Sequence, residues 1–338
     1  MSLYTTELRR LGKRRFTRYM TLIGLLVLAA VAVGTFLTNE RIGPAQRATA
    51  ERQAQAEYEQ QIRFTEQERV ECQRAETAGE PKNGRWPEDC AQITPPPRDA
   101  FQAQWYLPST FDFRENFGGV LTTYAAILVL VAFVVGASFV GAEWSTGGMM
   151  NLLLWRPRRT GVLLTKLAAL LTGVAAVTLL GTLVWTAAFW AVGTFRGSTE
   201  GMTGGAWQSF ALTGLRGFAL VLVAAVIGFA LASAGRHTAF ALGGVLAVAV
   251  VGQFGLGIVL SLANAKFPEA WLLPTYALAW MSKQVKLENY QACNYSTVSG
   301  CQPDTLTITW QQSSALFAVG LVLALGAALW GIRRRDIA

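Results

Sequence analysis

The chain has 338 residues, of which 52% are hydrophobic and only 15% are charged. In a soluble protein about a quarter of the residues are charged, and a disordered chain lacks long apolar blocks, so the composition excludes both classes. The net charge of +8 would suit nucleic-acid binding, but its meaning depends on where the charges lie along the chain.

Six stretches have the length and composition of membrane spans. A helix needs about 20 predominantly apolar residues to cross the hydrocarbon core, and none of the six contains Asp, Glu, Lys, Arg or His. They predict an all-α polytopic membrane protein, and the first is too long for a cleaved signal peptide. The spans are 19–37, 118–142, 167–195, 217–234, 238–263 and 313–332. The segments outside them are 1–18, 38–117, 143–166, 196–216, 235–237, 264–312 and 333–338.

The first segment, 1–18, places six Lys and Arg among scattered apolar side chains. As a helix it would lie along the membrane surface with its cations near anionic headgroups. We expect an amphipathic elbow before the first span.

The segment 38–117 is the only sizeable region outside the membrane. Its residues 48–76 are rich in Glu, Gln, Arg and Ala and contain neither Gly nor Pro, a composition that predicts a helix. The apolar stripe is poor, which favours a solvated helical arm over a long coiled coil.

The segment 143–166 follows the second span. Ser145 and Thr146 are suited to cap a short helix that runs to Trp155, with Glu143 near its positive end. Pro157 would end this helix. A short, partly apolar helix beneath the membrane has the form that fits a groove in another protein.

The segment 264–312 begins with an apolar run, 267–281, which contains two prolines and is too short to span the membrane. We expect an interfacial or re-entrant segment. A loop with two cysteines follows it.

The distribution of Lys and Arg predicts the orientation. The two termini, 143–166 and 235–237 share one side, which has 14 of the 29 cations and three of the 21 carboxylates. Both termini are therefore expected in the cytoplasm. The basic excess follows from topology, and no nucleic-acid partner is expected.

The four cysteines all fall on the opposite, oxidising side, where disulfides persist. Local pairs, Cys72–Cys90 and Cys293–Cys301, are favoured, and a disulfide between the two loops is the main alternative. No C-x-x-C pattern is present and His237 lies on the other side, so no zinc site is expected.

Two absences narrow the function. The sequence has no G-x-x-x-x-G-K-[ST] phosphate loop, so the chain is not expected to bind ATP in the usual way. The spans also lack the Asp, Glu or His that proton-coupled carriers place inside the membrane. Energy for any transport would have to come from another subunit.

The segment 143–166 resembles the permease subunits of ABC type-two exporters. Their signature here is an acidic residue, a small Gly-Thr-like element, Leu-x-x-Pro-x-x-Arg, and a lysine at the start of the next helix. The corresponding residues are Glu143, Gly147, Leu154, Pro157 and Lys166.

Two positions depart from this pattern. Gly148 stands where threonine is common, and both Arg158 and Arg159 are candidates for the signature arginine. The plan of a basic elbow, six spans and a broken segment before the sixth is also similar to the family. The 80-residue loop after the first span is longer than usual.

The resemblance implies a half-transporter in a bacterial inner or plasma membrane. Its partners would be two copies of a separate ATPase, a second permease subunit (identical or different) and membrane lipids. The ATPase would bind ATP and Mg, whereas this chain would be no enzyme and would hold no cofactor or metal. The residues implied in coupling to the ATPase are Glu143, Trp155, Arg156, Pro157, Arg159 and Lys166.

An uncharged path lined by apolar side chains favours an apolar or amphipathic substrate, such as a drug, peptide or lipid, moved by alternating access. The alternative is a non-transporting sensor or scaffold whose 38–117 loop binds a partner. An embedded lipid enzyme would need polar residues clustered at one membrane depth, and the sequence shows none.

Overall fold

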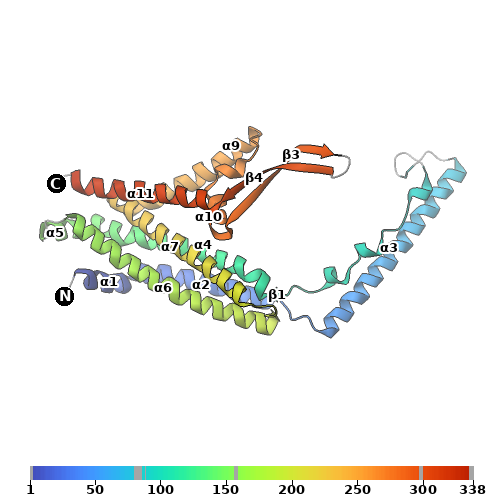
Figure 1. The fold of residues 1–338 in the computed structure, drawn as a ribbon, viewed down its shortest axis with the longest axis horizontal. Coiled ribbons are helices and arrows are strands. Elements are labelled where there is room, and N and C mark those ends of the chain that lie inside the picture. The colour runs from blue at the N-terminus through green and yellow to red at the C-terminus, as the bar shows by residue number, and fades with distance from the viewer. Residues whose placement is uncertain (1–2, 80–85, 88, 156–158, 297–299, 335–338) are drawn as a thin grey trace. The chain divides into compact units, whose positions relative to one another are not determined.

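A computed structural model of the chain describes residues 3–79, 86–87, 89–155, 159–296 and 300–334 (Figure 1). Six of the described helices are long and apolar enough to cross a membrane, which confirms the predicted all-α polytopic fold class. They are α2 (Arg15–Thr38), α4 (Phe113–Ser145), α6 (Arg159–Arg196), α7 (Gly204–Gly235), the continuous helix α8–η4–α9 and α11 (Trp310–Arg334).

The fifth of these spans changes its helical form in the middle. α8 (Thr238–Ala247) passes into a π-helical stretch, η4 (Val248–Gly255), and then into α9 (Leu256–Leu262). Stretches of π-helix are rare and are often found at functional sites. This one contains Gln253, whose Oε1 accepts a hydrogen bond of 2.7 Å from the Leu273 amide.

Several helices extend beyond the predicted spans. The predicted outer loop 196–216 is mostly helical, because α7 begins at Gly204, where Thr203 Oγ1 accepts a hydrogen bond from the Ala206 amide. Hydropathy marks only the part of a helix that can lie in hydrocarbon, so the polar first turns of α7 were missed.

The chain divides into two compact units. One, the arm unit, comprises Val33–Phe113 and Ala191–Thr199, and the other, the bundle, comprises Met1–Ala32, Arg114–Trp190 and Glu200–Ala338. In the arm unit the short strands β1 (Phe111–Asp112) and β2 (Gly197–Ser198) pair in parallel.

The arm unit is built on α3 (Pro44–Ala78), a helix of 35 residues, as its composition predicts. Pro44 occupies its first turn, and Gly79 ends it in the left-handed conformation with φ 68°. The short helices η1 (Cys90–Gln92) and η3 (Ala103–Tyr106) pack back on α3, whereas η2 (Arg98–Ala100) lies between them in the chain. Ala50 and Ala54 are buried on α3.

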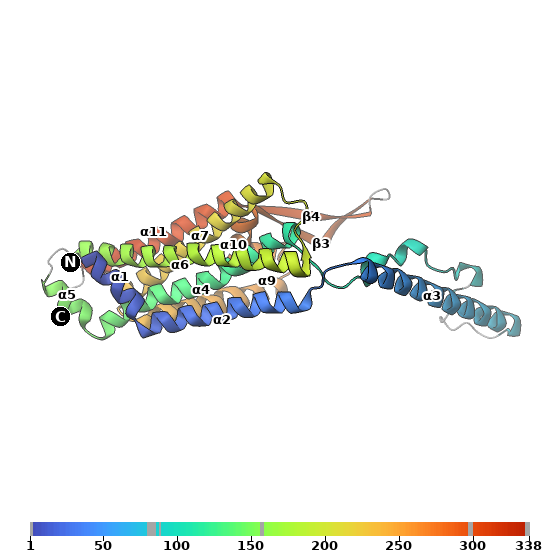
Figure 2. The ribbon, with the colours of Figure 1, turned by 90° about the horizontal axis from the view of Figure 1, so that it is seen from below.

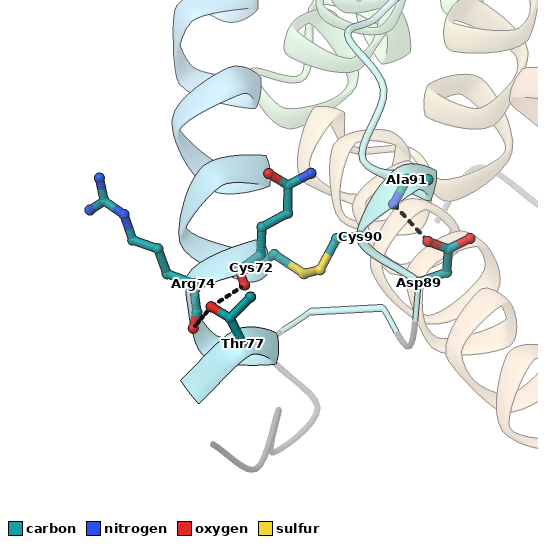
Figure 3. The surroundings of a disulfide bond; sticks show 7 residues. Cys72, Arg74, Thr77, Asp89, Cys90 and Ala91 are labelled. Atoms are coloured by element: carbon teal, nitrogen blue, oxygen red, sulfur yellow. Dashed lines mark hydrogen bonds between the residues drawn. A yellow bond between two sulfur atoms is a disulfide. The ribbon is translucent and has the colours of Figure 1, made fainter. Parts of the chain in front are cut away.

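A disulfide joins Cys72 of α3 to Cys90 of η1 (Figure 3). The bond confirms the predicted local pair and excludes the alternative in which Cys72 or Cys90 reaches the second outer loop. Cys301 is also disulfide-bonded, and the side chain of Cys293, its predicted partner, lies outside the described residues.

The centre of the bundle is formed by α4 and α7, which bury 50% and 56% of their most apolar windows, more than any other described span. Their backbones approach closely at two glycines. A Cβ added at Gly136 would overlap the carbonyl oxygen of Ala225, and one added at Gly228 would overlap that of Phe133. Small residues therefore determine this crossing.

The segment before the sixth span is broken, as predicted, into η5 (Pro268–Trp271) and α10 (Leu273–Ser282). Arg216 lies beside α10, where its guanidinium donates to the Met281 carbonyl at 3.4 Å and its own carbonyl accepts from Trp280 Nε1 at 2.9 Å. The cation lies near the C-terminal end of α10, where the helix dipole favours it.

The rest of the predicted disulfide loop is an antiparallel hairpin of β3 (Gln284–Ser296) and β4 (Gly300–Thr309). Val285 pairs with Ile308 and Leu287 with Leu306. The alternation of Thr with Leu and Ile in 305–309 is typical of a strand, and the sequence analysis, which expected only a disulfide loop here, did not predict it.

The α4–α7 crossing generates a prediction. Replacing Gly136 by Leu should lower the free energy of unfolding by about 2–3 kcal/mol or more, since the backbone of Ala225 cannot move aside for a side chain. Thermal unfolding in detergent measures the effect. The control is Gly119→Leu in the same helix, where no atom lies within 4 Å of the added Cβ; equal midpoints for the two variants would contradict the proposed packing.

Candidate functional site

One end of the bundle, here called the basic end, holds α1 (Leu3–Lys13), α5 (Gly148–Trp155) and the C-terminal end of α11 (Figures 1 and 2). The helix α1 lies against α6. The Tyr4 hydroxyl donates to Thr172 Oγ1 at 2.8 Å, and a Cβ at Gly173 would lie 2.5 Å from Leu11 Cδ2. Close contact with α6 therefore fixes one face of α1.

Four charged side chains meet at this end and form the buried ion cluster: Glu7, Arg14, Glu143 and Lys166. The Lys166 ammonium lies 2.7 Å from Glu7 Oε2 and 2.6 Å from Glu143 Oε2. These are close ion pairs, although neither Lys166 Nζ nor Glu7 Oε2 makes a well-directed hydrogen bond. The side chains of Glu7 and Lys166 are fully buried.

Arg14 closes the cluster from the junction between α1 and α2. Its guanidinium contacts Glu143 Oε1 at 2.8 Å and donates to the carbonyls of Ser138 and Phe139 at 3.1 and 2.9 Å. The Phe139 ring also lies under both cations, 5.1 Å from the Arg14 guanidinium and 5.6 Å from the Lys166 ammonium. Aromatic faces attract cations in this geometry.

The four side chains of the cluster balance in charge, and Arg10, whose side chain is 55% exposed, adds a contact of 3.2 Å to Glu7 Oε1 from the surface. Burying charges has a large desolvation cost, so a buried pair adds little stability relative to apolar residues, whereas removal of one partner costs about 3–5 kcal/mol. The main effect of the cluster is therefore to fix the relative positions of the helices that carry its charges, and its net contribution to stability is small. It holds α1 to the end of α4 and the beginning of α6.

The turn between α7 and α8 supports the same end of α4. Arg236 adopts the left-handed conformation, with φ 53°, and its guanidinium lies 5.1 Å from the centre of the Trp144 ring. Gly141 permits the approach, since a Cβ there would lie 2.5 Å from Thr238 Oγ1. His237 Nδ1 accepts a hydrogen bond from the Ala239 amide and caps α8, the structural role expected of a turn residue.

The helix α5 differs from its prediction in where it begins. α4 continues to Ser145, the chain turns at Gly147 with φ 73°, and α5 starts at Gly148. The hydroxyls of Ser145 and Thr146 both donate back to the Ala142 carbonyl, so they complete α4 and do not cap α5. The Glu143 carboxylate faces Lys166 and Arg14 instead of the beginning of α5.

One side of α5 packs in the bundle and another faces outward. Met149 is fully buried and Leu152 packs against the same core. Leu154 is 76% exposed. A short helix anchored by Met149 and Leu152 thus presents a large apolar side chain at its surface.

Between α1 and α5 lies a polar groove of about 940 Å³, called the basic groove. Four cations and Glu143 account for its charge, so its net charge is positive. Its lining residues are Thr6, Arg9, Arg10, Lys13, Arg14, Glu143, Gly148, Asn151 and Leu152.

The structure brings together two of the six predicted coupling residues, Glu143 and Lys166. Arg159 is half-buried at the first residue of α6. Arg156, Pro157 and the side chain of Trp155 lie outside the described residues.

The sequence analysis missed Glu7 and Arg14. Glu7 is the only carboxylate in 1–18, among six cations, and this isolation was a usable signal. In the described part of the chain, no three His, Cys, Asp or Glu side chains gather as a metal site would require.

A family model described as ABC-2 family transporter protein matches residues 1–330. The chain belongs to the ABC-2 transporter family. The ABC-2 chain is therefore a membrane-spanning subunit of the ABC transporter class, as the resemblance of 143–166 implied. Searches of curated proteins and of solved structures gave no match.

The buried ion cluster of the ABC-2 chain generates the next prediction. Lys166→Met removes the buried cation between Glu7 and Glu143 and leaves the buried Glu7 with only the exposed Arg10 as a partner, so it should cost about 3–5 kcal/mol of stability. The double variant Lys166→Met/Glu7→Gln keeps the Arg14–Glu143 pair and removes the buried Glu7 charge, so it should regain part of the loss.

Thermal unfolding of the single and double variants measures this coupling. The control is Lys13→Met, which removes an exposed cation from the same end. If Lys166→Met unfolded at the same temperature as Lys13→Met, or if Glu7→Gln gave no rescue, the cluster would not have the assigned role.

Proposed function

We propose that the chain is the permease subunit of an ATP-driven exporter, coupled to a separate ATPase through α5 and the basic groove. The observation that most supports this is the buried ion cluster beside α5. It joins α1, α4 and α6, and its Glu143 lines the basic groove together with residues of α5, so a force applied to α5 would reach two spans through close contacts.

The basic end is proposed to face the cytoplasm. The support is the positive-inside rule, together with the four cations of the basic groove. The ATPase would bind ATP and Mg, because this sequence has no phosphate loop. In this proposal Glu143 and Lys166 act by positioning, since both are buried, and Leu154 and the groove make the contact.

Two copies of the ATPase and a second permease subunit would complete the transporter. Support for a second permease comes from the fifth span, which buries none of its most apolar window within the chain. A Cβ added at Gly243 or Gly244 would meet no atom of another described segment within 4 Å, so their small surface is open to another helix. Both lie in α8.

The substrate is proposed to be apolar or amphipathic, such as a drug, peptide or lipid. The six spans lack Asp and Glu in their apolar windows, and α4 and α7 pack through Gly, Ala, Val and Phe. ATP-driven movement of α5 would rock these helices and alternate access to the two sides. The motion would be a sliding of packed helices against each other.

The alternative, a sensor or scaffold, is favoured by one feature. The arm unit is a compact unit with its own 35-residue helix and disulfide, and a permease of six spans does not require it. The two functions differ in whether an ATPase binds at the basic end.

Co-expression with a candidate ABC ATPase, chosen from the neighbouring reading frames by its phosphate-loop motif, tests the proposal. The wild-type chain should co-purify with the ATPase, and Leu154→Glu should abolish the complex, because a carboxylate replaces the exposed apolar contact. Arg333→Glu, which places the same carboxylate at the end of α11, should leave it intact.

Substrate-stimulated ATP hydrolysis gives the second readout. Glu143→Gln should retain the complex but lose the stimulation, as expected for a positioning residue. A wild-type chain that captures no ATPase would favour the scaffold, and a Leu154→Glu chain that captures it normally would exclude α5 as the contact.

A further inference from the structure

A second pocket, of about 500 Å³, lies in the bundle on the membrane side of α1. It is lined by α1, α2, α4 and α6 and by Val221 of α7, and its volume falls within the range of about 300–1,000 Å³ that ligand sites have. Close helix contacts border it. Leu11 meets Gly173 on one side, and a Cβ at Gly24 would lie 2.9 Å from Val131 Cγ2 on another.

The pocket is apolar except at its mouth. Leu, Val, Ala and Gly supply most of its wall, three threonines contribute hydroxyls, and Arg18 is its one charged residue. From Arg18 to Leu25 the wall follows α2 for seven residues, about 10 Å along the helix axis. Such a site fits a hydrocarbon chain with a polar group at one end.

At the mouth of the pocket, Arg18 and Thr17 have polar groups that could bind an anion. Arg18 Nε donates to the Gly12 carbonyl at 2.9 Å, and in the described part of the chain its guanidinium pairs with no carboxylate. Nearby, Thr17 Oγ1 is buried with no hydrogen-bond partner among the described residues. A guanidinium and an unpartnered hydroxyl at the end of an apolar pocket suit a phosphate group.

The pocket also opens to the surface of the spans. Leu22, Leu25 and Val177 line it and are 52%, 53% and 49% exposed. A chain can therefore enter sideways from the bilayer, and no passage through the protein is needed.

We propose that this pocket binds one anionic phospholipid, with an acyl chain between α2, α4 and α6 and its phosphate at Arg18. Charge complementarity determines the choice of lipid, because the mouth lies in a segment with six cations and one carboxylate. The bound chain contacts Leu8 and Leu11 and so adds apolar support to α1 next to the residue that carries the cluster's Glu7 carboxylate. The inference does not depend on the proposed ATPase partner.

Native mass spectrometry of the purified full chain, titrated with phosphatidylglycerol or with phosphatidylcholine of the same chains, tests the proposal. One phosphatidylglycerol should bind more tightly than further copies and than phosphatidylcholine. Arg18→Gln should weaken this binding about tenfold, the loss expected of a hydrogen bond to a charged group. Arg15→Gln, an exposed cation one turn away that does not line the pocket, should leave it within about twofold.

A second pair of variants tests the acyl-chain site. Val177→Trp should fill the pocket and remove the tight binding. Val184→Trp lies about two turns along the same helix, is 70% exposed and does not line the pocket, and should have no effect. Glycerol phosphate tests whether a soluble phosphate is the ligand, and it should not compete.

Four results would overturn the proposal. They are equal affinity for the two lipids, unchanged binding by Arg18→Gln, unchanged binding by Val177→Trp, and displacement of the lipid by glycerol phosphate.

Discussion

The position of one buried ammonium group organises the basic end of this protein. Lys166 lies within 2.7 Å of carboxylates from two other segments, Glu7 of α1 and Glu143 of α4. A buried charge must be paired, and the desolvation cost makes every unpaired arrangement unfavourable. Arrangements of the three segments that separate these charges are therefore strongly disfavoured at this end. Arg14, at the junction of α1 and α2, joins the same set through Glu143 and two carbonyls of α4.

This constraint explains how α5 can be anchored in the bundle and still offer a surface to a binding partner. α5 is connected directly to α4 by a turn at Gly147, and its Met149 is fully buried, so α5 cannot move without α4 and its ion partners. Leu154 and the basic groove remain at the surface. In the proposed transporter the contact and the transmission are thus divided between different residues. In this proposal the exposed groups would bind the ATPase, and the buried charges would pass its movement to the spans.

The sequence was most informative where structure is determined locally. The six spans, the α3 helix and the Cys72–Cys90 bond all follow from composition within a few dozen residues. The ion cluster could not be predicted in this way, because Glu7 and Glu143 are 136 positions apart and hydropathy says nothing about which charges meet. Glu143 and Lys166 were singled out by their order in a family pattern, which gives neither their partners nor their burial. The β3–β4 hairpin was not predicted for a different reason. The segment was interpreted from its two cysteines as a disulfide loop, whereas the alternation of Thr with Leu and Ile indicates a strand.

Hydrogen–deuterium exchange in the wild-type chain and in Glu7→Gln measures the central claim most directly. If Lys166 holds α1 against α4 and α6, loss of the Glu7 charge should speed amide exchange in α1 and α5, while exchange in the β3–β4 hairpin stays the same. Unchanged protection of α1 in the variant would show that apolar packing at Leu11 and Gly173 is sufficient, and would contradict the account.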